Sequence, residues 1–167
     1  METSPAPLLC RPIGLIRSPL QRPADAPVQA AGAAGIHGTV AVYPEFGEGL
    51  LDLGGFSHLI LLYHFHRSAA PKLVVTPFLD PVPHGVFATR APARPNAIGL
   101  SVVRLDRIEG LTLHVSELDI LDGTPLLDIK PFVPAFDHRA GAVSGWLSPD
   151  KVQSLDERRA DDRFERK

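Results

Sequence analysis

A proline-rich loop holds the side chains of this chain that are best suited to binding an anion. Residues 87–100 contain Arg90, Arg94 and Asn96, separated by Pro92 and Pro95. Each proline fixes φ and removes a backbone donor, so regular strand or helix cannot run through the segment. Arginine offers a planar fork of donors, and asparagine adds a donor and an acceptor. The spacing predicts either a stiff loop that binds a carboxylate or phosphate, or a surface turn with solvated arginines.

A second polar cluster lies at residues 121–131. Asp122-Gly123 is a strong turn signal, and Asp and Thr side chains bond readily to the local backbone. Asp122, Thr124 and the carbonyls of such a turn could hold the ribose or amino groups of a nucleoside. Composition alone favours the simpler interpretation, a hairpin turn followed by a strand.

Histidines gather in an apolar stretch and at its end. The two-residue period of a strand places His58, His64 and His66 on one face, which raises the question of a metal site. No cysteine or carboxylate lies at ligand spacing, so we expect no metal. We expect His66 and Arg67 to face a pocket from the end of the strand; the alternative is hydrogen-bonded histidines in the core or at its rim.

Common cofactor and nucleophile motifs are absent from the sequence. Gly47-x-Gly49 is followed by Asp52 where a dinucleotide-binding motif has its third glycine, and there is no phosphate-binding P-loop. Cys10 lies in an apolar stretch and is a poor nucleophile candidate. A Rossmann-type cofactor fold is therefore not expected.

The apolar pattern predicts many short strands separated by turns. The hairpin turned by Glu109-Gly110 is the clearest local signal. A short helical turn is expected within residues 44–55, a helix from Ser148, and a long loop, functional or mobile, at residues 21–35. Strands are expected at residues 8–18, 36–43, 57–65, 73–78, 99–108, 111–115, 118–121 and 126–129. Together these elements predict a mainly β fold, a single compact barrel with a few short helices.

Length and composition are those of an ordinary globular domain. The 167 residues are 44% hydrophobic and 22% charged, and the net charge of −2 weakens, without excluding, an interaction with nucleic acid. One cysteine permits no internal disulfide, and no secretory signal or apolar run of about 20 residues is present. We therefore expect a cytoplasmic protein that does not enter a membrane. Residues 1–140 would form the barrel domain, and residues 141–167 a short charged C-terminal extension that is helical or frayed.

Five segments occur in the order typical of one protein family. They are IGLIRSP at 13–19, GFSHL at 55–59, GVFATR at 85–90, RPNAIGL at 94–100 and DGTPLLDIKP at 122–131. On these motifs the chain resembles the TrmO/YaeB-type family over about residues 8–137. Its members are S-adenosylmethionine-dependent tRNA methyltransferases that modify N6 of threonylcarbamoyladenosine next to the anticodon. Ala91 and Ala97 are conservative departures from the family pattern.

The resemblance implies a barrel-based methyl-donor pocket in a homodimer. Arg90 suits the carboxylate of S-adenosylmethionine, and Asp122 with backbone carbonyls suits the amino groups and ribose. Arg94 is left for the loop or for RNA. The residues carried over to the donor pocket are Ser18, Pro19, Leu20, His66, Arg67, Arg90, Leu100, Asp122, Gly123, Thr124 and Pro125.

The function that the resemblance implies is methylation of tRNA, with His66 and Asp137 as candidate bases. Many bacterial members continue into a second domain thought to help hold tRNA, whereas here a short charged tail follows Trp146. A regulatory module that binds the donor without methylating tRNA, or a methyltransferase for another substrate, is therefore the alternative. A basic rim on the pocket would favour the enzyme, and an acidic or occluded mouth the module. The candidates for that rim are Arg94, Arg104, Arg107 and Lys130. The loop at 21–35 would act as a lid.

Overall fold

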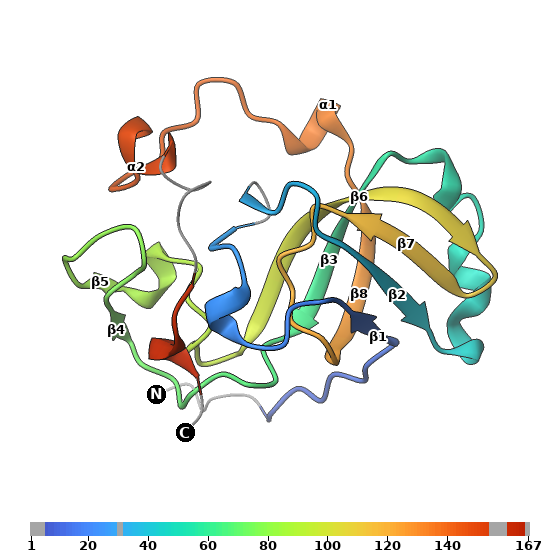
Figure 1. Ribbon diagram of the computed structural model, residues 1–167, viewed down its shortest axis with the longest axis horizontal. Coiled ribbons are helices and arrows are strands. Elements are labelled where there is room, and N and C mark those ends of the chain that lie inside the picture. The colour runs from blue at the N-terminus through green and yellow to red at the C-terminus, as the bar shows by residue number, and fades with distance from the viewer. Residues whose placement is uncertain (1–5, 30–31, 154–159, 166–167) are drawn as a thin grey trace.

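The molecule is organised around a closed antiparallel barrel, shown in Figure 1 as a computed structural model that describes residues 6–29, 32–153 and 160–165. Around the barrel the strand order is β1-β2-β7-β6-β3-β8, and β8 pairs with β1 to close it. The strands are β1 (Gly14–Arg17), β2 (His37–Val42), β3 (His58–His64), β6 (Ile98–Glu109), β7 (Thr112–Ser116) and β8 (Thr124–Pro131). The predicted mainly β barrel is confirmed.

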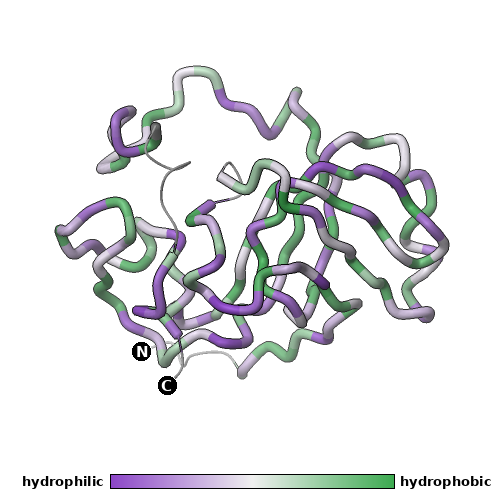
Figure 2. The backbone as a smooth tube through the Cα atoms, in the orientation of Figure 1, coloured by the Kyte–Doolittle hydropathy of each residue, from purple (hydrophilic) through white to green (hydrophobic). Residues whose placement is uncertain are grey.

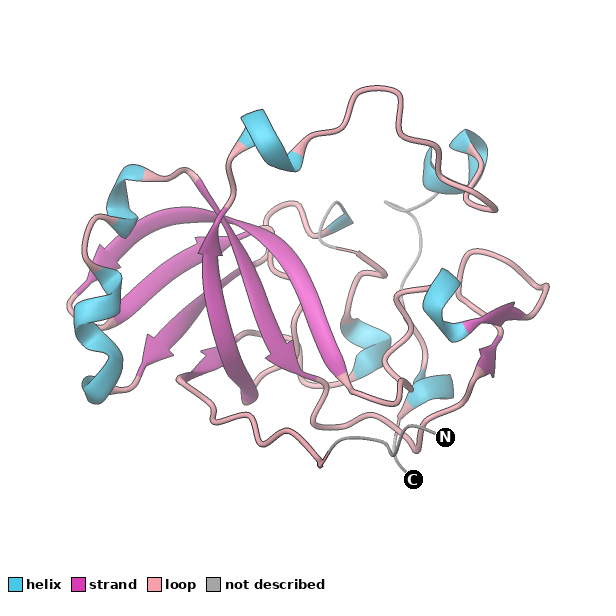
Figure 3. Ribbon diagram, turned by 180° about the vertical axis from the view of Figure 1, so that it is seen from behind, coloured by secondary structure: helices cyan, strands magenta, loops and turns pink. Residues whose placement is uncertain are grey.

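Short elements decorate the barrel (Figure 3). β4 (Val74–Val75) and β5 (His84–Gly85) form a separate two-stranded sheet. The 3-10 helices are η1 (Pro23–Asp25), η3 (Pro44–Leu50), η4 (Leu53–Gly55), η5 (Val86–Ala88) and η7 (Asp162–Phe164), and the α-helices are α1 (Pro134–Asp137) and α2 (Pro149–Gln153). Within the described ranges, no helix is both long and apolar enough to span a bilayer.

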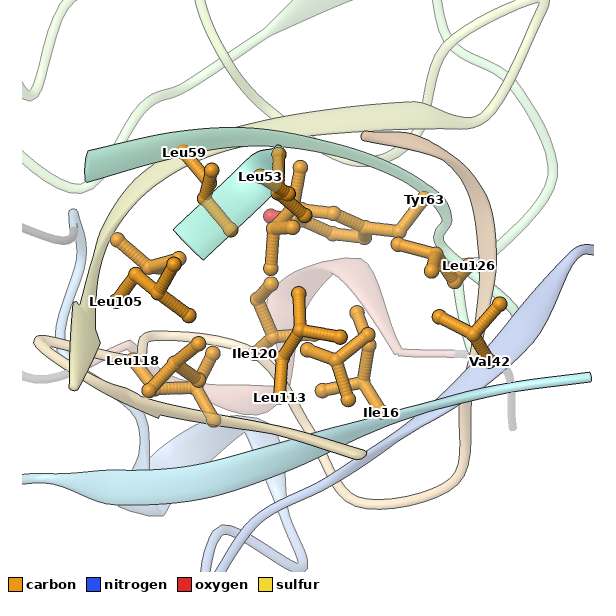
Figure 4. Close-up of a cluster of buried hydrophobic side chains, with 14 residues drawn as sticks. Ile16, Val42, Leu53, Leu59, Tyr63, Leu105, Leu113, Leu118, Ile120 and Leu126 are labelled. Carbon is orange, nitrogen blue, oxygen red and sulfur yellow. The ribbon is translucent and has the colours of Figure 1, made fainter. Parts of the chain in front are cut away.

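Alternating burial along the strands builds the core. On β6, Val103 and Leu105 point inward while their neighbours along the strand are more exposed. Hydrophobic and hydrophilic stretches are interspersed along the tube in Figure 2. Side chains from the strands meet inside the barrel together with Leu118 and Ile120 (Figure 4). Each fully buried Leu, Ile or Val contributes about 1.5–3 kcal/mol, so this cluster is the main stabilising unit of the barrel.

Three predicted strands are wrong in extent or type. Only Gly14–Arg17 of residues 8–18 is strand, because β1 meets β2 and β8 over those residues alone, and Leu8 and Leu9 are exposed. Within residues 73–78, the strand is limited to β4. Residues 118–121 form no strand; Leu118 and Ile120 are buried in the barrel core, which this segment closes at one end instead of pairing along the wall. The helical turn expected within residues 44–55 is two 3-10 helices, η3 and η4.

The C-terminal extension packs against loops of the barrel domain. Phe164 is only 7% exposed, in a second apolar cluster with Val75, Val86, Ala91 and Ala93. The amide of Ala69 donates to the carbonyl of Phe164 at 2.8 Å, and the amide of Ala160 donates to Ala26 at 2.9 Å. Residues 160–165 are therefore held against the barrel domain and are not a frayed end. The described part of the extension contains α2 and η7, and residues 154–159 and 166–167 of the predicted helical tail lie outside the described residues.

Trp146 and Lys151 attach the extension to the segment of residues 80–88, which contains β5 and η5. The indole of Trp146 stacks on His84 with ring centres 4.4 Å apart and donates to the carbonyl of Ala88 at 2.7 Å. The carboxylate of Asp80 accepts hydrogen bonds from Lys151 and from the amide of Val82. The bond from Lys151, followed by that from Val82, lowers the pKa of Asp80 to about 2.

Gly99→Ala should destabilise the barrel. The ring of Tyr63 lies across Gly99, its partner on the neighbouring strand, and an added Cβ would fall 2.2 Å from ring atom Cε2. Overpacking of a well-packed core costs about 1–3 kcal/mol, which chemical denaturation would measure as a lower free energy of unfolding. Gly49→Ala is the control, because a Cβ there meets nothing within 4 Å. Equal stability of the two variants would contradict the packing of Tyr63 on Gly99.

The stabilisation from Asp80 should disappear in acid. Because the pKa of Asp80 is lower in the folded than in the unfolded chain, its contribution is complete above about pH 4 and is lost as the pH falls towards 2. The difference in thermal midpoint between wild type and Asp80→Asn, followed by fluorescence of the single tryptophan, should be constant from pH 7 to 5 and shrink below pH 4. Asp128→Asn, which removes the exposed pair with Lys130, is the matched control. A difference between wild type and Asp80→Asn that does not change with pH would rule out this linkage.

Candidate functional site

A cavity of about 1010 Å³ opens where several barrel strands end. Its wall includes Tyr63 at the end of β3, residues 98–102 at the start of β6, and Thr124 at the start of β8. Residues 26–29, 87–92 and 119–121, together with Glu117, complete most of the remaining wall. Residues 146–147 and 160–161 of the C-terminal extension also line it. The cavity thus collects chain segments that lie far apart in the sequence.

The predicted donor residues divide into a lining group and a supporting group. The members that line the cavity are His66, Arg67, Arg90, Leu100 and Thr124. Ser18, Pro19, Leu20, Asp122, Gly123 and Pro125 are not among the lining residues. The structure therefore brings the end of β3, the arginine loop and Thr124 together at the cavity surface. The turn at 18–20 and the rest of the turn at 122–125 do not line the cavity.

The supporting turns hold each other and the wall in place. The amide of Ser18 donates to Asp122 Oδ1 at 3.1 Å, and Ser18 Oγ donates to the carbonyl of Ile120 at 2.7 Å. The amide of Asp122 donates to the carbonyl of Leu20 at 2.8 Å. Asp122 also lies 3.5 Å from Arg17, so this carboxylate faces the first turn and not the cavity. Gly123, at φ 73°, supplies the left-handed conformation that turns the chain into β8.

The two arginines of the proline-rich loop have different environments. Arg90 lines the cavity and donates from Nη1 to Gln29 Oε1 at 2.9 Å, which brings the loop at 21–35 to the cavity. Arg94 donates from Nη1 to the carbonyl of Thr89 at 2.8 Å and to those of Val86 and Ala91 at 3.2 and 3.3 Å. Arg94 therefore fixes the fold of its own loop, one of the two roles left open for it.

His66 presents an acceptor at the cavity wall. Thr124 Oγ1 donates its only hydrogen to the carbonyl of Leu121 at 2.8 Å, so the contact with His66 Nδ1 at 3.3 Å requires the histidine to donate. Nε2 is then the acceptor of the neutral ring. Burial, followed by the charge of Arg67, lowers the pKa of His66, and the ring is neutral at pH 7.

A buried polar chain beside these residues was not predicted from the sequence. Tyr63, Ser101 and Asp119 all line the cavity, and Ser101 Oγ donates to Asp119 Oδ1 at 2.6 Å. The sequence did contain a signal for this chain. Tyr63 and Ser101 occupy inward positions of predicted strands, and Asp119 lies between the apolar Leu118 and Ile120. The carboxylate of Glu117, two residues earlier, also lines the cavity.

The cavity has charges of both signs instead of a basic rim. Arg67 forms an ion pair with Glu165, and Asp161 is a further acidic lining residue. Of the four predicted rim residues, Arg94 lines the cavity. The other three, Arg104, Arg107 and Lys130, do not line it and pair with Asp106, Glu109 and Asp128 at 3.7, 2.8 and 2.8 Å.

Two further predicted groups lie outside the cavity lining. The carboxylate of Asp137, one candidate base, accepts the amide of Val133 on exposed α1. His58 bonds to Ser57 at 2.9 Å. The described part of the chain contains no cluster of three or more His, Cys, Asp or Glu residues placed to hold a metal ion.

Comparisons with known proteins identify relatives over most of the chain. Residues 15–138 match the family model of the tRNA-methyltransferase O N-terminal domain. A Pyrococcus abyssi protein named as a probable S-adenosyl-L-methionine-binding protein is 56% identical over 158 residues, which cover 94% of this chain and 85% of that protein. A mouse tRNA (adenine(37)-N6)-methyltransferase is 43% identical over 91 residues, 53% of this chain and 21% of the mouse protein.

A solved structure shares both sequence and fold. The crystal structure of TrmO from Pseudomonas aeruginosa matches with a TM-score of 0.72 and 42% identity, over 85% of this chain. The chain spans 62% of that TrmO chain. From the matched domain, the high identity and the shared barrel, this chain belongs to the tRNA-methyltransferase O family.

Proposed function

We propose that this protein is an S-adenosylmethionine-dependent methyltransferase whose acceptor is N6 of threonylcarbamoyladenosine, next to the anticodon of tRNA. The observation that carries the proposal is one cavity lined by Arg90, His66 and Thr124, which come from three separate parts of the sequence. The names of the Pyrococcus and mouse relatives support the donor and the acceptor, respectively.

The lining residues fit the chemical groups of the donor. The volume of about 1010 Å³ is at the upper end of the range usual for small-molecule sites. Arg90 bonds to the neutral Gln29, so its positive charge is suited to a carboxylate. Phe87, Ile98 and Leu100 add exposed apolar surface to the wall, which suits the adenine ring.

The chain contributes positioning, and His66 is the better placed of the two candidate bases. When bound, S-adenosylmethionine supplies a methyl group on a cationic sulfur, and such an in-line transfer depends strongly on alignment. Neutral His66, with Nδ1 bonded to Thr124, has an acceptor nitrogen suited to taking the proton from N6. Asp137 has no such position, because it lies outside the cavity lining.

The alternative is a regulatory module that binds the donor without methylating tRNA. The pairing of Arg104, Arg107 and Lys130 with acidic neighbours favours this alternative, as does the acidic contribution of the C-terminal extension to the cavity wall. For either function we propose the domain organisation expected from the sequence, a donor-binding barrel at 1–140 followed by an extension at 141–167. A homodimer and a cytoplasmic location are further proposals, which follow from the family resemblance and the composition.

Arg90→Ala should weaken binding of S-adenosylmethionine to the purified protein. Loss of a charged hydrogen bond costs about 1.5–3 kcal/mol, so the dissociation constant from calorimetry should rise by roughly tenfold to a hundredfold. Arg104→Ala removes an exposed arginine outside the cavity and should bind as wild type does. Well-folded wild-type protein that binds no donor would contradict both candidate functions.

Deletion of the gene should abolish N6 methylation of threonylcarbamoyladenosine in tRNA. Mass spectrometry of nucleosides from purified tRNA would measure this loss, which wild-type protein should restore and Arg90→Ala should restore only partly. Undiminished methylation in the deletion strain, with donor binding intact in vitro, would favour the regulatory module or another acceptor.

A further inference from the structure

Asp119 is a charged residue of the cavity that the donor assignments above leave unused. It lies between the fully buried Leu118 and the nearly buried Ile120, in the segment that closes the barrel core. Its position follows from those two neighbours, because anchoring both in the core fixes the backbone on either side of the carboxylate. It is therefore held by the fold more firmly than a carboxylate on an exposed loop.

Two buried hydroxyl groups orient this carboxylate. Ser101 Oγ uses its only hydrogen in the 2.6 Å bond to Asp119 Oδ1, so Tyr63 must be the donor in its 3.0 Å bond to Ser101. Tyr63 is 5% exposed and Ser101 3% exposed. Burial, followed by the negative charge of Asp119, raises the pKa of Tyr63, so the phenol remains a donor. The bond from Ser101 has the short length typical of a charged acceptor.

Arg90 and Asp119 place opposite charges around the same hydroxyl group. Both line the cavity, and the charge of Arg90 acts on the Tyr63 hydroxyl in the opposite direction to that of Asp119. A carboxylate has about four acceptor positions, so it can accept from an ammonium group while it also accepts from Ser101. The cavity therefore offers a guanidinium and an oriented carboxylate, both of which act on the hydroxyl group of Tyr63.

The positive charge of Arg90 and the negative charge of Asp119, in one cavity, suit a zwitterionic ligand group. The amino-acid end of S-adenosylmethionine carries a carboxylate and an ammonium on one carbon, and both charges are present before and after methyl transfer. A carboxylate against the sulfonium would instead stabilise a charge that the reaction removes, which opposes catalysis. Hydrogen bonding favours the ionised form of a carboxylate, which suits a permanent counter-charge better than a proton acceptor.

We infer that Asp119, oriented by Ser101 and Tyr63, binds the α-ammonium group of the donor while Arg90 binds the adjacent carboxylate. The inference rests on the proposed donor site and adds a binding residue to it. It assigns the Tyr63–Ser101–Asp119 chain to recognition of the amino-acid end of the donor.

Calorimetry of Asp119→Asn with three ligands tests the inference. S-adenosylhomocysteine lacks the sulfonium charge but keeps the ammonium, so the variant should bind it and S-adenosylmethionine more weakly by the same factor, tenfold or more. Its affinity for methylthioadenosine, which has no amino-acid end, should be unchanged. The matched control is Asp106→Asn: Asp106 also accepts a serine hydroxyl, that of Ser116 at 3.0 Å, but it does not line the cavity.

Other patterns of affinity would overturn the inference. Weakening for S-adenosylmethionine alone would place Asp119 at the sulfonium, and wild-type affinities with a reduced methylation rate would make it a base. If Asp119→Asn fails to fold, wild-type protein can be titrated with S-adenosylhomocysteine and its analogue without the α-amino group; equal affinities would refute the contact. Failure of wild type to bind either natural ligand would refute the donor site itself, which is a separate outcome.

Discussion

Closure of the barrel is the constraint on which the rest of the structure depends. The four residues of β1 pair with β2 on one side and β8 on the other, and this short strand completes a ring of six. Because neighbouring strands are antiparallel, the end of β3 lies beside the starts of β6 and β8 at one rim. Segments that are distant in the sequence are thereby brought to a common cavity.

Two apolar clusters hold the cavity between them. The barrel core fixes Tyr63 and the segment around Ile120 on one side. The smaller cluster of Val86, Ala91 and Phe164 holds the arginine loop and the C-terminal extension on the other. Arg94 bonds to three carbonyls within that loop, whereas Arg90 bonds to Gln29 on a different loop. The loop that brings Arg90 to the cavity wall is thus stabilised by a small apolar core of its own.

The family resemblance assigned Arg90 to a pocket, whereas its spacing alone left a solvated surface turn open. The sequence itself was sufficient to predict the barrel, its main hairpin and the irregular loop that carries Arg90. These features depend on local signals: alternation along β7, the glycine turn before it, and prolines that limit the arginine loop to one region of backbone space. Alternation could not predict that residues 118–121 leave the barrel wall, because burial of Leu118 and Ile120 looks the same in a strand and in a segment closing the core. The Leu8 stretch has strand-like residues but no partner, and partners are a property of the whole sheet.

Asp119, Asp122 and Phe164 owe their positions to contacts with residues that are distant in the sequence. Asp119 receives its role from Ser101 on a different strand, a contact with no local signature. Asp122 was predicted at the cavity from its motif, but the carboxylate is used to cap the turn at Ser18. Phe164 lies in a charged part of the sequence, and its burial could not be predicted there because the cluster that it joins comes from residues 75–93. Non-local packing therefore decided which motif residues line the cavity.

A crystal structure of the protein with S-adenosylhomocysteine would test the donor site most directly. The ligand should lie in the cavity at the rim of the barrel, with its amino-acid carboxylate on Arg90 and its adenosine towards the turn at Thr124. Ligand bound at a different surface, or a cavity without ligand at concentrations that saturate binding in solution, would contradict the donor site proposed for this fold.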